Sequence, residues 1–195
     1  MTPTDDSARW DAEAEAFDEA ADHGLRDATV GAAWRSLLAS LLPPAPARVA
    51  DLGCGTGSLS LLLADEGHPV TGVDFSPAMV ARAVAKADGR SDVRFVVGDA
   101  LSPPLDRASY DVVLCRHVLW ALPDPAAALR RWIGLLSPGG RLVLVEGRWS
   151  TGAGLSAAET VALVEATGRP AELLRLPEPV YWGRDITDER YVVRS

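Results

Sequence analysis

A nine-residue stretch, Val49-Ala-Asp-Leu-Gly-Cys-Gly-Thr-Gly57, carries the strongest fold signal in the chain. Its first residues suit a buried strand, and three alternating glycines follow directly. Because glycine lacks a Cβ, such a loop can turn tightly and let a ligand lie against its backbone. In an open parallel sheet, ligands bind beyond the carboxyl ends of the strands, where the strand order reverses. The stretch therefore predicts the first strand and the ligand loop of an α/β sheet.

Outward from this stretch, short apolar runs alternate with helical patterns. Strands are expected at residues 48–52, 70–74, 93–97, 110–115 and 141–145, with helices over about 57–66, from Ser76-Pro77 onward and over 125–136. Apolar strands separated by helices indicate a parallel sheet covered on both faces. After a helix at about 157–166, strands at 171–176 and 190–194 are joined without a helix, which suits an antiparallel pair.

The length of 195 residues suits a single domain. Its expected parts are an N-terminal helical cap over 1–44, a cofactor-binding core over 45–150, and a C-terminal helix with the strand pair over 151–195. The cap reads as two helices between about Ser7 and Leu42, because Trp10 and Phe17 recur at helical spacing and Pro43-Pro44 ends a second apolar run. Residues 1–30 hold nine acidic and two basic residues and so carry most of the net charge of −8.

Composition argues against several classes of protein. A content of 48% hydrophobic and 24% charged residues is typical of a globular chain, and the acidic balance makes nucleic acid an improbable partner. Cys54 and Cys115 match neither a disulfide scaffold nor a metal motif, so we expect reduced thiols and no metal. The start of the sequence lacks a signal-peptide pattern, and no apolar run could span a bilayer, which favours a cytoplasmic protein without membrane contact.

Two ligands compete for the glycine loop. A dinucleotide motif, GxGxxG, requires a third glycine at position 58, where this chain has Ser58. In addition, Asp51 stands two residues before the first glycine, and its carboxylate would repel a pyrophosphate at the start of the next helix. The same carboxylate would attract an ammonium group. The loop therefore favours S-adenosylmethionine, whose reactive end carries an ammonium and a sulfonium, over a nicotinamide dinucleotide.

Acidic residues follow the next two strands as well. Asp74 ends the second strand, where its carboxylate can accept hydrogen bonds from ribose hydroxyls, a feature shared with nicotinamide sites. Asp99 follows the third strand, where it can accept a hydrogen bond from the amino group of an adenine. Three acids at successive strand ends together predict a ligand that contains adenosine.

Five motifs follow one another in the order of a known family: Val49–Gly57, Val73-Asp-Phe-Ser-Pro-Ala-Met79, Gly98-Asp-Ala100, His117-Val-Leu-Trp-Ala-Leu-Pro-Asp-Pro125 and Leu136-Ser-Pro-Gly-Gly-Arg-Leu142. Over about residues 47–150 the chain resembles the class I S-adenosylmethionine-dependent methyltransferases, in particular the small type (methyltransferase type 11/25) similar to enzymes of ubiquinone and menaquinone biosynthesis. The resemblance implies a Rossmann-like α/β fold with seven strands, mostly parallel with the last antiparallel, helices on both faces, and an N-terminal helical cap over the site.

The resemblance also implies a contact for individual residues. Asp51 and Gly53 would face the methionine moiety, with Cys54, Gly55 and Gly57 in the same loop, and Asp74 would face the ribose. Phe75 and Met79 would lie on the adenine face, and Asp99 and Ala100 at its edge. The backbone around Cys115 would meet the amino-acid end of the cofactor, and S-adenosylhomocysteine would be the product.

Methyl transfer from a sulfonium is an in-line displacement with a neutral leaving group, so the enzyme needs mainly to align the reactants and exclude water. A base is required only when the acceptor is a hydroxyl or a similar weak acid. His117, directly after the fourth strand, is the leading candidate for a catalytic base, since its ordinary pKa suits proton removal near neutrality. His23 in the cap is the second candidate. His68, between a helix and the second strand, is expected on the surface.

The acceptor is expected to be a small molecule. Candidate contacts are Trp10 and Phe17 of the cap, together with Arg116, Trp120, Arg148 and Trp149 near the expected mouth of the site. Aromatic rings with arginines suit a flat or anionic compound. The fourth strand is followed by Arg116-His117-Val118 and not by the Asn/Asp-Pro-Pro-aromatic signature of enzymes that methylate bases or glutamine, which also disfavours nucleic acid.

Two other hypotheses remain open at this point. The chain could bind S-adenosylmethionine or S-adenosylhomocysteine without catalysis, because the base is unsettled and only about ten residues separate the fifth strand from the next helix, too few for the substrate-binding insertions of larger methyltransferases. A nicotinamide oxidoreductase is disfavoured by Ser58 and Asp51. The sequence is compatible with a monomer or a homodimer.

Overall fold

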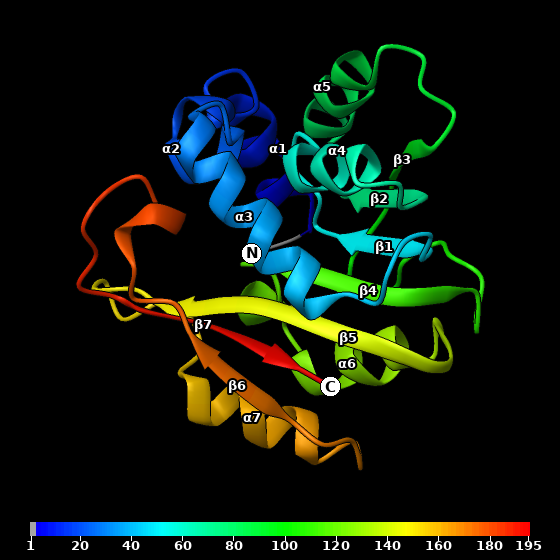
Figure 1. Cartoon of the computed structure of the whole chain (residues 1–195), viewed down its shortest axis with the longest axis vertical. Helices are drawn as coiled ribbons and strands as arrows, with labels where there is room; N and C mark the ends of the chain where they lie inside the picture. The colour runs from blue at the N-terminus through cyan, green and yellow to red at the C-terminus, as the bar shows by residue number, and fades with distance from the viewer. Residues whose placement is uncertain (1–2) are drawn as a thin grey trace.

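A computed structural model of the chain describes residues 3–195, which form a seven-stranded sheet between two helical layers (Figure 1). The strand order is β3-β2-β1-β4-β5-β7-β6. The strands are β1 (Val49–Leu52), β2 (Val70–Asp74), β3 (Val93–Val97), β4 (Tyr110–Arg116), β5 (Leu136–Arg148), β6 (Glu172–Arg175) and β7 (Glu189–Arg194). The order reverses at β1, which pairs with β2 on one side and β4 on the other. The glycine loop after β1 thus lies at the position where ligands of open α/β sheets bind.

The predicted antiparallel tail is confirmed. β7 runs antiparallel to both β5 and β6, whereas the pairs among β1 to β5 are parallel. β7 is inserted between β5 and β6, so the start of β7 lies beside the carboxyl end of β5. β5 is longer than the predicted 141–145, because Leu136 already pairs with Tyr110 before a register shift.

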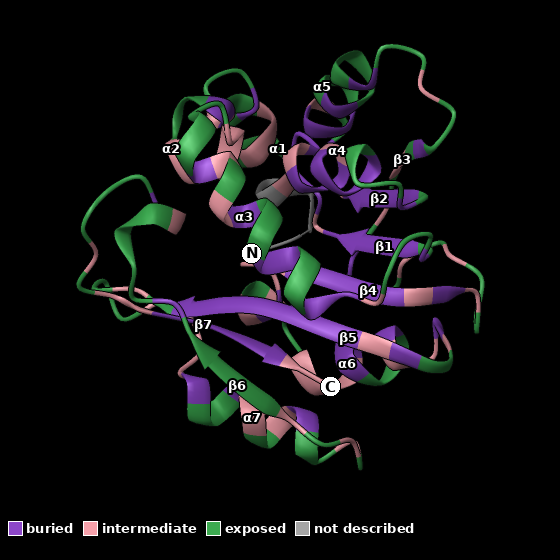
Figure 2. Ribbon diagram, viewed as in Figure 1, coloured by how far each residue is buried: buried purple, intermediate pink, exposed green. Residues whose placement is uncertain are grey.

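The helices form one layer on each face of the sheet. α3 (Ala28–Leu41), α4 (Ser58–Asp65) and α5 (Pro77–Ala87) cover one face, and α6 (Pro125–Ile133) and α7 (Ala157–Glu165) cover the other (Figure 1). Ser76 caps α5, since its hydroxyl accepts a hydrogen bond from the Met79 amide at 3.1 Å. Each face has its own apolar core, and the central strands are buried along their length (Figure 2). Trp132 lies fully buried in the second core.

The N-terminal segment differs from the two predicted helices. It forms α1 (Pro3–Glu13), the short 3-10 helix η1 (Phe17–Glu19), α2 (Ala21–Gly24) and α3. The chain turns sharply after α2, because Leu25 adopts a left-handed conformation with φ of 52°, and Asp27 then caps α3 by accepting from the amides of Thr29 and Val30. The break leaves α1, η1 and α2 as a separate unit near α4 and α5 (Figure 1).

The structure also shows the surroundings of His68 and of the two cysteines. His68 is buried, not exposed, because the Ala47 amide donates to its Nδ1 at 3.2 Å and fixes the chain before β1. The structure holds Cys54 and Cys115 as free, buried thiols. Within residues 3–195, no helix is long and apolar enough to cross a membrane.

Candidate active site

The glycine loop turns in a way that only glycine allows at two of its positions. Gly53, Gly55 and Gly57 have φ values of 73°, 54° and 79°. A Cβ at Gly53 would lie 2.2 Å from Val118 Cγ2, and one at Gly57 would lie 2.6 Å from Phe95 Cζ. The Gly53 and Cys54 amides both donate to the carbonyl of Val73, at 2.8 and 3.0 Å. The loop is therefore fixed between β2 and the segment that follows β4.

Two buried carboxylates lie beside this loop. Asp51 is 2% exposed and accepts a hydrogen bond from the Ser60 hydroxyl at 2.6 Å. Burial raises its pKa to about 6, although the Ser60 hydroxyl and the Arg116 charge oppose this rise. Asp74 accepts from the Gly55 amide at 2.8 Å and from the Ser76 amide at 2.9 Å, and burial raises its pKa against these hydrogen bonds. A cation placed near Asp51 would restore its ordinary ionisation.

The side chains predicted around an adenine lie at the ends of β2 and β3. These two strands are paired in parallel, with Asp74 opposite Val97. Met79 is buried, Phe75 is half-buried, and Asp99 is exposed, with its carboxylate accepting from the Leu101 amide at 2.8 Å. The carbonyl of Ala100 accepts from the Trp132 indole at 2.7 Å, which fixes the turn after β3 to α6.

The cap is attached to the loop by two acids. The Thr56 hydroxyl donates to Asp18 of η1, and Lys86 Nζ donates to the same carboxylate at 2.8 Å. Asp11 of α1 accepts from the Ser76 hydroxyl at 2.5 Å and so reaches the start of α5. These contacts hold the N-terminal segment directly over the glycine loop.

An aromatic group in the cap faces the loop. The Phe17 ring stacks on His23 at 4.3 Å and meets Trp10 edge-on at 6.2 Å. Phe17 Cε1 lies 3.2 Å from where a Cβ of Gly55 would be. Trp10, Phe17 and His23 are thus brought together next to the glycine loop.

His117 occupies an unusual position after β4. Its φ of 61° lies in the left-handed region, which is rare for residues other than glycine but is more accessible to His, Asn and Asp. Its ring stacks on Trp182 at 5.9 Å and meets Trp149 edge-on at 5.2 Å. Its Nε2 is buried and has no hydrogen-bond partner. Burial, followed by the charges of Arg116 and Arg190, lowers its pKa well below 6.5, so the ring is neutral at pH 7.

Of the other predicted residues, Trp120 and Cys115 lie beside His117 or the glycine loop, whereas Arg148 lies on the surface. Trp120 belongs with His117, because its indole donates to the His117 carbonyl at 3.0 Å and its ring lies 5.2 Å from Trp149. Cys115 lies fully buried in β4 opposite Leu52, so its backbone is next to the glycine loop. Arg148 points away from this group; its side chain is 52% exposed and lies 3.7 Å from Glu159.

The Arg116 side chain makes contacts that the sequence did not predict. Its guanidinium donates to the Asp22 carbonyl at 2.5 Å and lies over the Trp34 ring at 5.2 Å. It therefore connects α2 of the cap to β4 and α3, while its charge also reaches Asp51.

Three residues of the site carried no signal in the sequence. Ser60 orients Asp51 from the first turn of α4. Glu146 of β5 is fully buried, and its Oε1 accepts from the amides of Val118 and Leu119 at 3.1 and 2.9 Å, which fixes the segment after His117. Arg190 of β7 lies over Trp149 and Trp182. Each reads as an ordinary polar residue in its own element, and only the tertiary structure gives it these partners.

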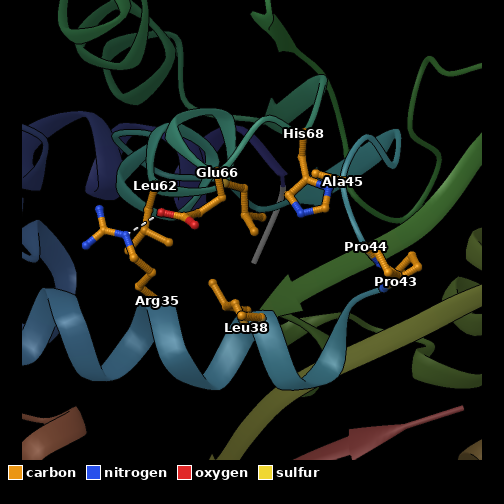
Figure 3. A pocket seen from close by; sticks show the side chains of 10 residues that line it. Arg35, Leu38, Pro43, Pro44, Ala45, Leu62, Glu66 and His68 are labelled. Carbon is orange, nitrogen blue, oxygen red and sulfur yellow. Dashed lines mark hydrogen bonds and ion pairs between the residues drawn. The ribbon is translucent and has the colours of Figure 1, made fainter.

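A cavity of about 160 Å³ lies elsewhere, between α3 and α4 (Figure 3). Arg35, Leu38, Leu62 and Glu66 form its walls, and Arg35 pairs with Glu66 at 2.6 Å. His68, which precedes β2, also lines the cavity, so the cavity lies toward the amino ends of the strands. The glycine loop follows the carboxyl end of β1 at the opposite edge, and this cavity is not part of the candidate active site.

Comparison with known proteins agrees with this geometry. Residues 50–144 match the family of methyltransferase domains. The demethylmenaquinone methyltransferase of Thermus thermophilus is 40% identical over 117 residues, which are 58% of this chain and 53% of that protein. The ubiquinone biosynthesis O-methyltransferase of Xanthomonas axonopodis is 39% identical over 105 residues, or 53% of this chain and 44% of that protein. The chain thus spans about half the length of the curated relatives that it matches.

Solved structures extend the likeness beyond the core. Magnesium protoporphyrin IX methyltransferase from Synechocystis PCC 6803, solved with bound S-adenosylmethionine, is 25% identical with a TM-score of 0.63 over 86% of this chain and 76% of that one. The cyclase SpnF shares the fold at 21% identity, with a TM-score of 0.71 over 82% of this chain and 79% of that one.

The strand order reverses at β1, and a buried acid, Asp51, precedes the glycine loop. Both features agree with the matches to methyltransferases. Residues 50–144 match the methyltransferase domain family, and the proteins that the chain resembles include a methyltransferase solved with bound S-adenosylmethionine. The resemblance on which the sequence analysis relied is therefore confirmed, as is the seven-stranded fold.

Proposed function

We propose that this protein transfers a methyl group from S-adenosylmethionine to a small-molecule acceptor. The observation that carries the proposal is the Asp51 carboxylate, which lies buried beside the glycine loop. None of the ion pairs found within residues 3–195 includes Asp51 or Asp74. A buried carboxylate without a directly paired cation is costly, and the ammonium group of the cofactor would supply that cation.

The chain's own residues would hold the cofactor along the carboxyl edge of β1, β2 and β3. The amino-acid end of the cofactor would lie against the glycine loop and the Cys115 backbone. The loop residues are Asp51, Gly53, Cys54, Gly55 and Gly57. The Asp74 oxygens each accept one backbone hydrogen bond and retain lone pairs for ribose hydroxyls. Phe75, Met79, Asp99 and Ala100 would enclose the adenine.

When bound, the cofactor supplies a methyl group on a positively charged sulfur. The protein's task is then to align the acceptor with that methyl and to exclude water, which can lower the barrier by roughly 7–11 kcal/mol. The contacts of Asp11, Asp18 and Arg116 would keep the cap closed over the loop.

On the acceptor side, His117 would act as the base where the acceptor must lose a proton. Its ring is neutral at pH 7, and its buried Nε2 has no partner in the protein. Trp10, Phe17, Arg116, Trp120 and Trp149 would line the acceptor's position, with Arg148 at the rim.

We also propose that the protein acts in the cytoplasm, as a monomer or homodimer, without nucleic acid; its reduced thiols and net charge of −8 support this.

The test has two parts. Calorimetry should show binding of S-adenosylhomocysteine and none of NADH, since Asp51 disfavours a pyrophosphate. Labelled S-adenosylmethionine should then transfer its methyl group in a screen of quinols, phenols, amines and carboxylates, with quinols first because relatives are named for quinone biosynthesis. Binding of S-adenosylhomocysteine without methyl transfer to any acceptor would favour the non-catalytic alternative, and binding of NADH instead would overturn the proposal.

A further inference from the structure

The Arg190 side chain of β7 lies against β5, where a glycine faces it. It is opposite Gly147 in the pairing of β7 with β5, and a Cβ at Gly147 would lie 2.8 Å from Arg190 Cδ. The absence of that Cβ lets the arginine side chain lie flat over β5. Its guanidinium is then 4.8 Å from the Trp149 ring and 5.2 Å from the Trp182 ring.

Most of the hydrogen-bonding capacity of this guanidinium is unused. Its Nη2 donates to Asp188 at 2.8 Å, but Nε and Nη1 are buried without an acceptor. The side chain is only 4% exposed, so water does not solvate these donors freely. Because buried polar groups are nearly always hydrogen-bonded, two orphaned donors on one buried cation indicate a missing acceptor.

The surroundings favour an anion as that acceptor. His117 contacts the same two tryptophans, so its ring belongs to the same cluster. One carboxylate, Asp188, pairs with Arg190, and its other oxygen accepts from the Ser150 amide at 2.6 Å. A single shared carboxylate therefore leaves the cluster with an excess of donors. The flat faces of the indoles favour a planar group beside them.

We propose that Arg190 is the specificity-determining residue for a planar acceptor that carries a carboxylate. This deepens the proposed function, since it assigns the substrate class of the same site. The carboxylate would accept from Arg190 Nε or Nη1, and the ring to which it is attached would lie against the half-buried Trp149. The acceptor's reacting atom would then be held on the His117 side.

The test compares an acid with its neutral amide. Benzoate and benzamide share ring and shape and differ in charge, and ligand-observed NMR can titrate each against the whole protein, with and without S-adenosylhomocysteine. We expect benzoate to bind at least tenfold more tightly than benzamide. Arg190→Met keeps the apolar stem of the side chain but removes the guanidinium, and it should abolish that preference. Arg175→Met, on the exposed strand β6, makes the same change outside the cluster and should retain it.

Asp188→Asn gives a second measurement if Arg190→Met does not fold. The amide retains an oxygen for Ser150 but no longer neutralises Arg190, so benzoate should bind severalfold more tightly than to the wild type. Equal binding of benzoate and benzamide, or a preference that persists in Arg190→Met, would overturn the inference. A stronger preference for phenyl phosphate than for benzoate would overturn the carboxylate class. Binding of S-adenosylhomocysteine is measured separately, so failure of the methyl-transfer proposal would be seen independently.

Discussion

Glu146→Gln should change how the stability of this protein depends on pH. The wild-type carboxyl is fully buried in β5, and burial raises its pKa to about 8 from an ordinary 4.5, against two backbone hydrogen bonds to its Oε1. Glutamine keeps an oxygen for the Val118 and Leu119 amides but has no proton to lose. The substitution therefore isolates the ionisation of one side chain from its structural contacts.

The sign of the effect follows from linkage. Below pH 4.5 the carboxyl is protonated in both the folded and the unfolded chain, so its contribution to stability is fully present. As the pH rises toward 8, the unfolded chain ionises while the folded chain keeps its proton, and the free energy of unfolding falls. At about 1.4 kcal/mol per pKa unit, the full loss approaches ~5 kcal/mol, against a total stability of ~5–15 kcal/mol for a typical domain.

Urea unfolding followed by tryptophan fluorescence, at steps between pH 5 and pH 9, measures this difference. The unfolding free energy of Glu146→Gln minus that of the wild type should rise by about 1.4 kcal/mol per pH unit, and level off near the folded-state pKa of about 8. Glu165→Gln makes the same chemical change on the exposed surface of α7 and controls for the loss of one acid. A difference that stays constant across this pH range would refute the reasoning.

Three further outcomes are expected. Asp74→Ala should weaken binding of S-adenosylhomocysteine at least tenfold by calorimetry, because each charge-assisted hydrogen bond contributes ~1.5–3 kcal/mol; unchanged affinity would remove Asp74 from the ribose site. His117→Asn, which tolerates the left-handed backbone, should lower kcat for a hydroxyl acceptor, and the wild-type rate should fall only well below pH 6.5; an undiminished kcat would exclude His117 as the base. Lys86→Met should loosen the cap by about 1–3 kcal/mol, seen as faster amide exchange in α1 and α2; unaltered exchange would mean that apolar contacts alone hold it.

The features that the sequence predicted correctly are those with short-range causes. The strand before the glycines and Ser76-Pro77 at the start of α5 depend on neighbours within a few residues, and the tail pair follows from the lack of a helical pattern in the segment that joins its strands. His68 was wrongly expected on the surface, because its partner is the amide of Ala47, 21 positions away. The further division of the cap was also missed, although its cause is local: Gly24 packs so closely on Asp18, six residues earlier, that a Cβ would meet its carbonyl at 2.1 Å.

Phe17, His117 and Trp149 were predicted on the acceptor side from the sequence, but Arg190 was not, because the proposed acceptor side is assembled from several elements. Arg190 has no distinguishing pattern within its strand, and it reaches the site only because β7 is inserted between β5 and β6. Trp149, Trp182 and Arg190 all lie after residue 144, where the match to the methyltransferase domain family ends, and Phe17 lies before its start at residue 50. The matched segment holds the glycine loop and the acids at the strand ends, which suit one shared cofactor. Residues that would choose the acceptor come mostly from outside that segment, so relatives with the same core can act on different compounds, and the substrate of this chain must be sought from the chemistry of its own tail and cap.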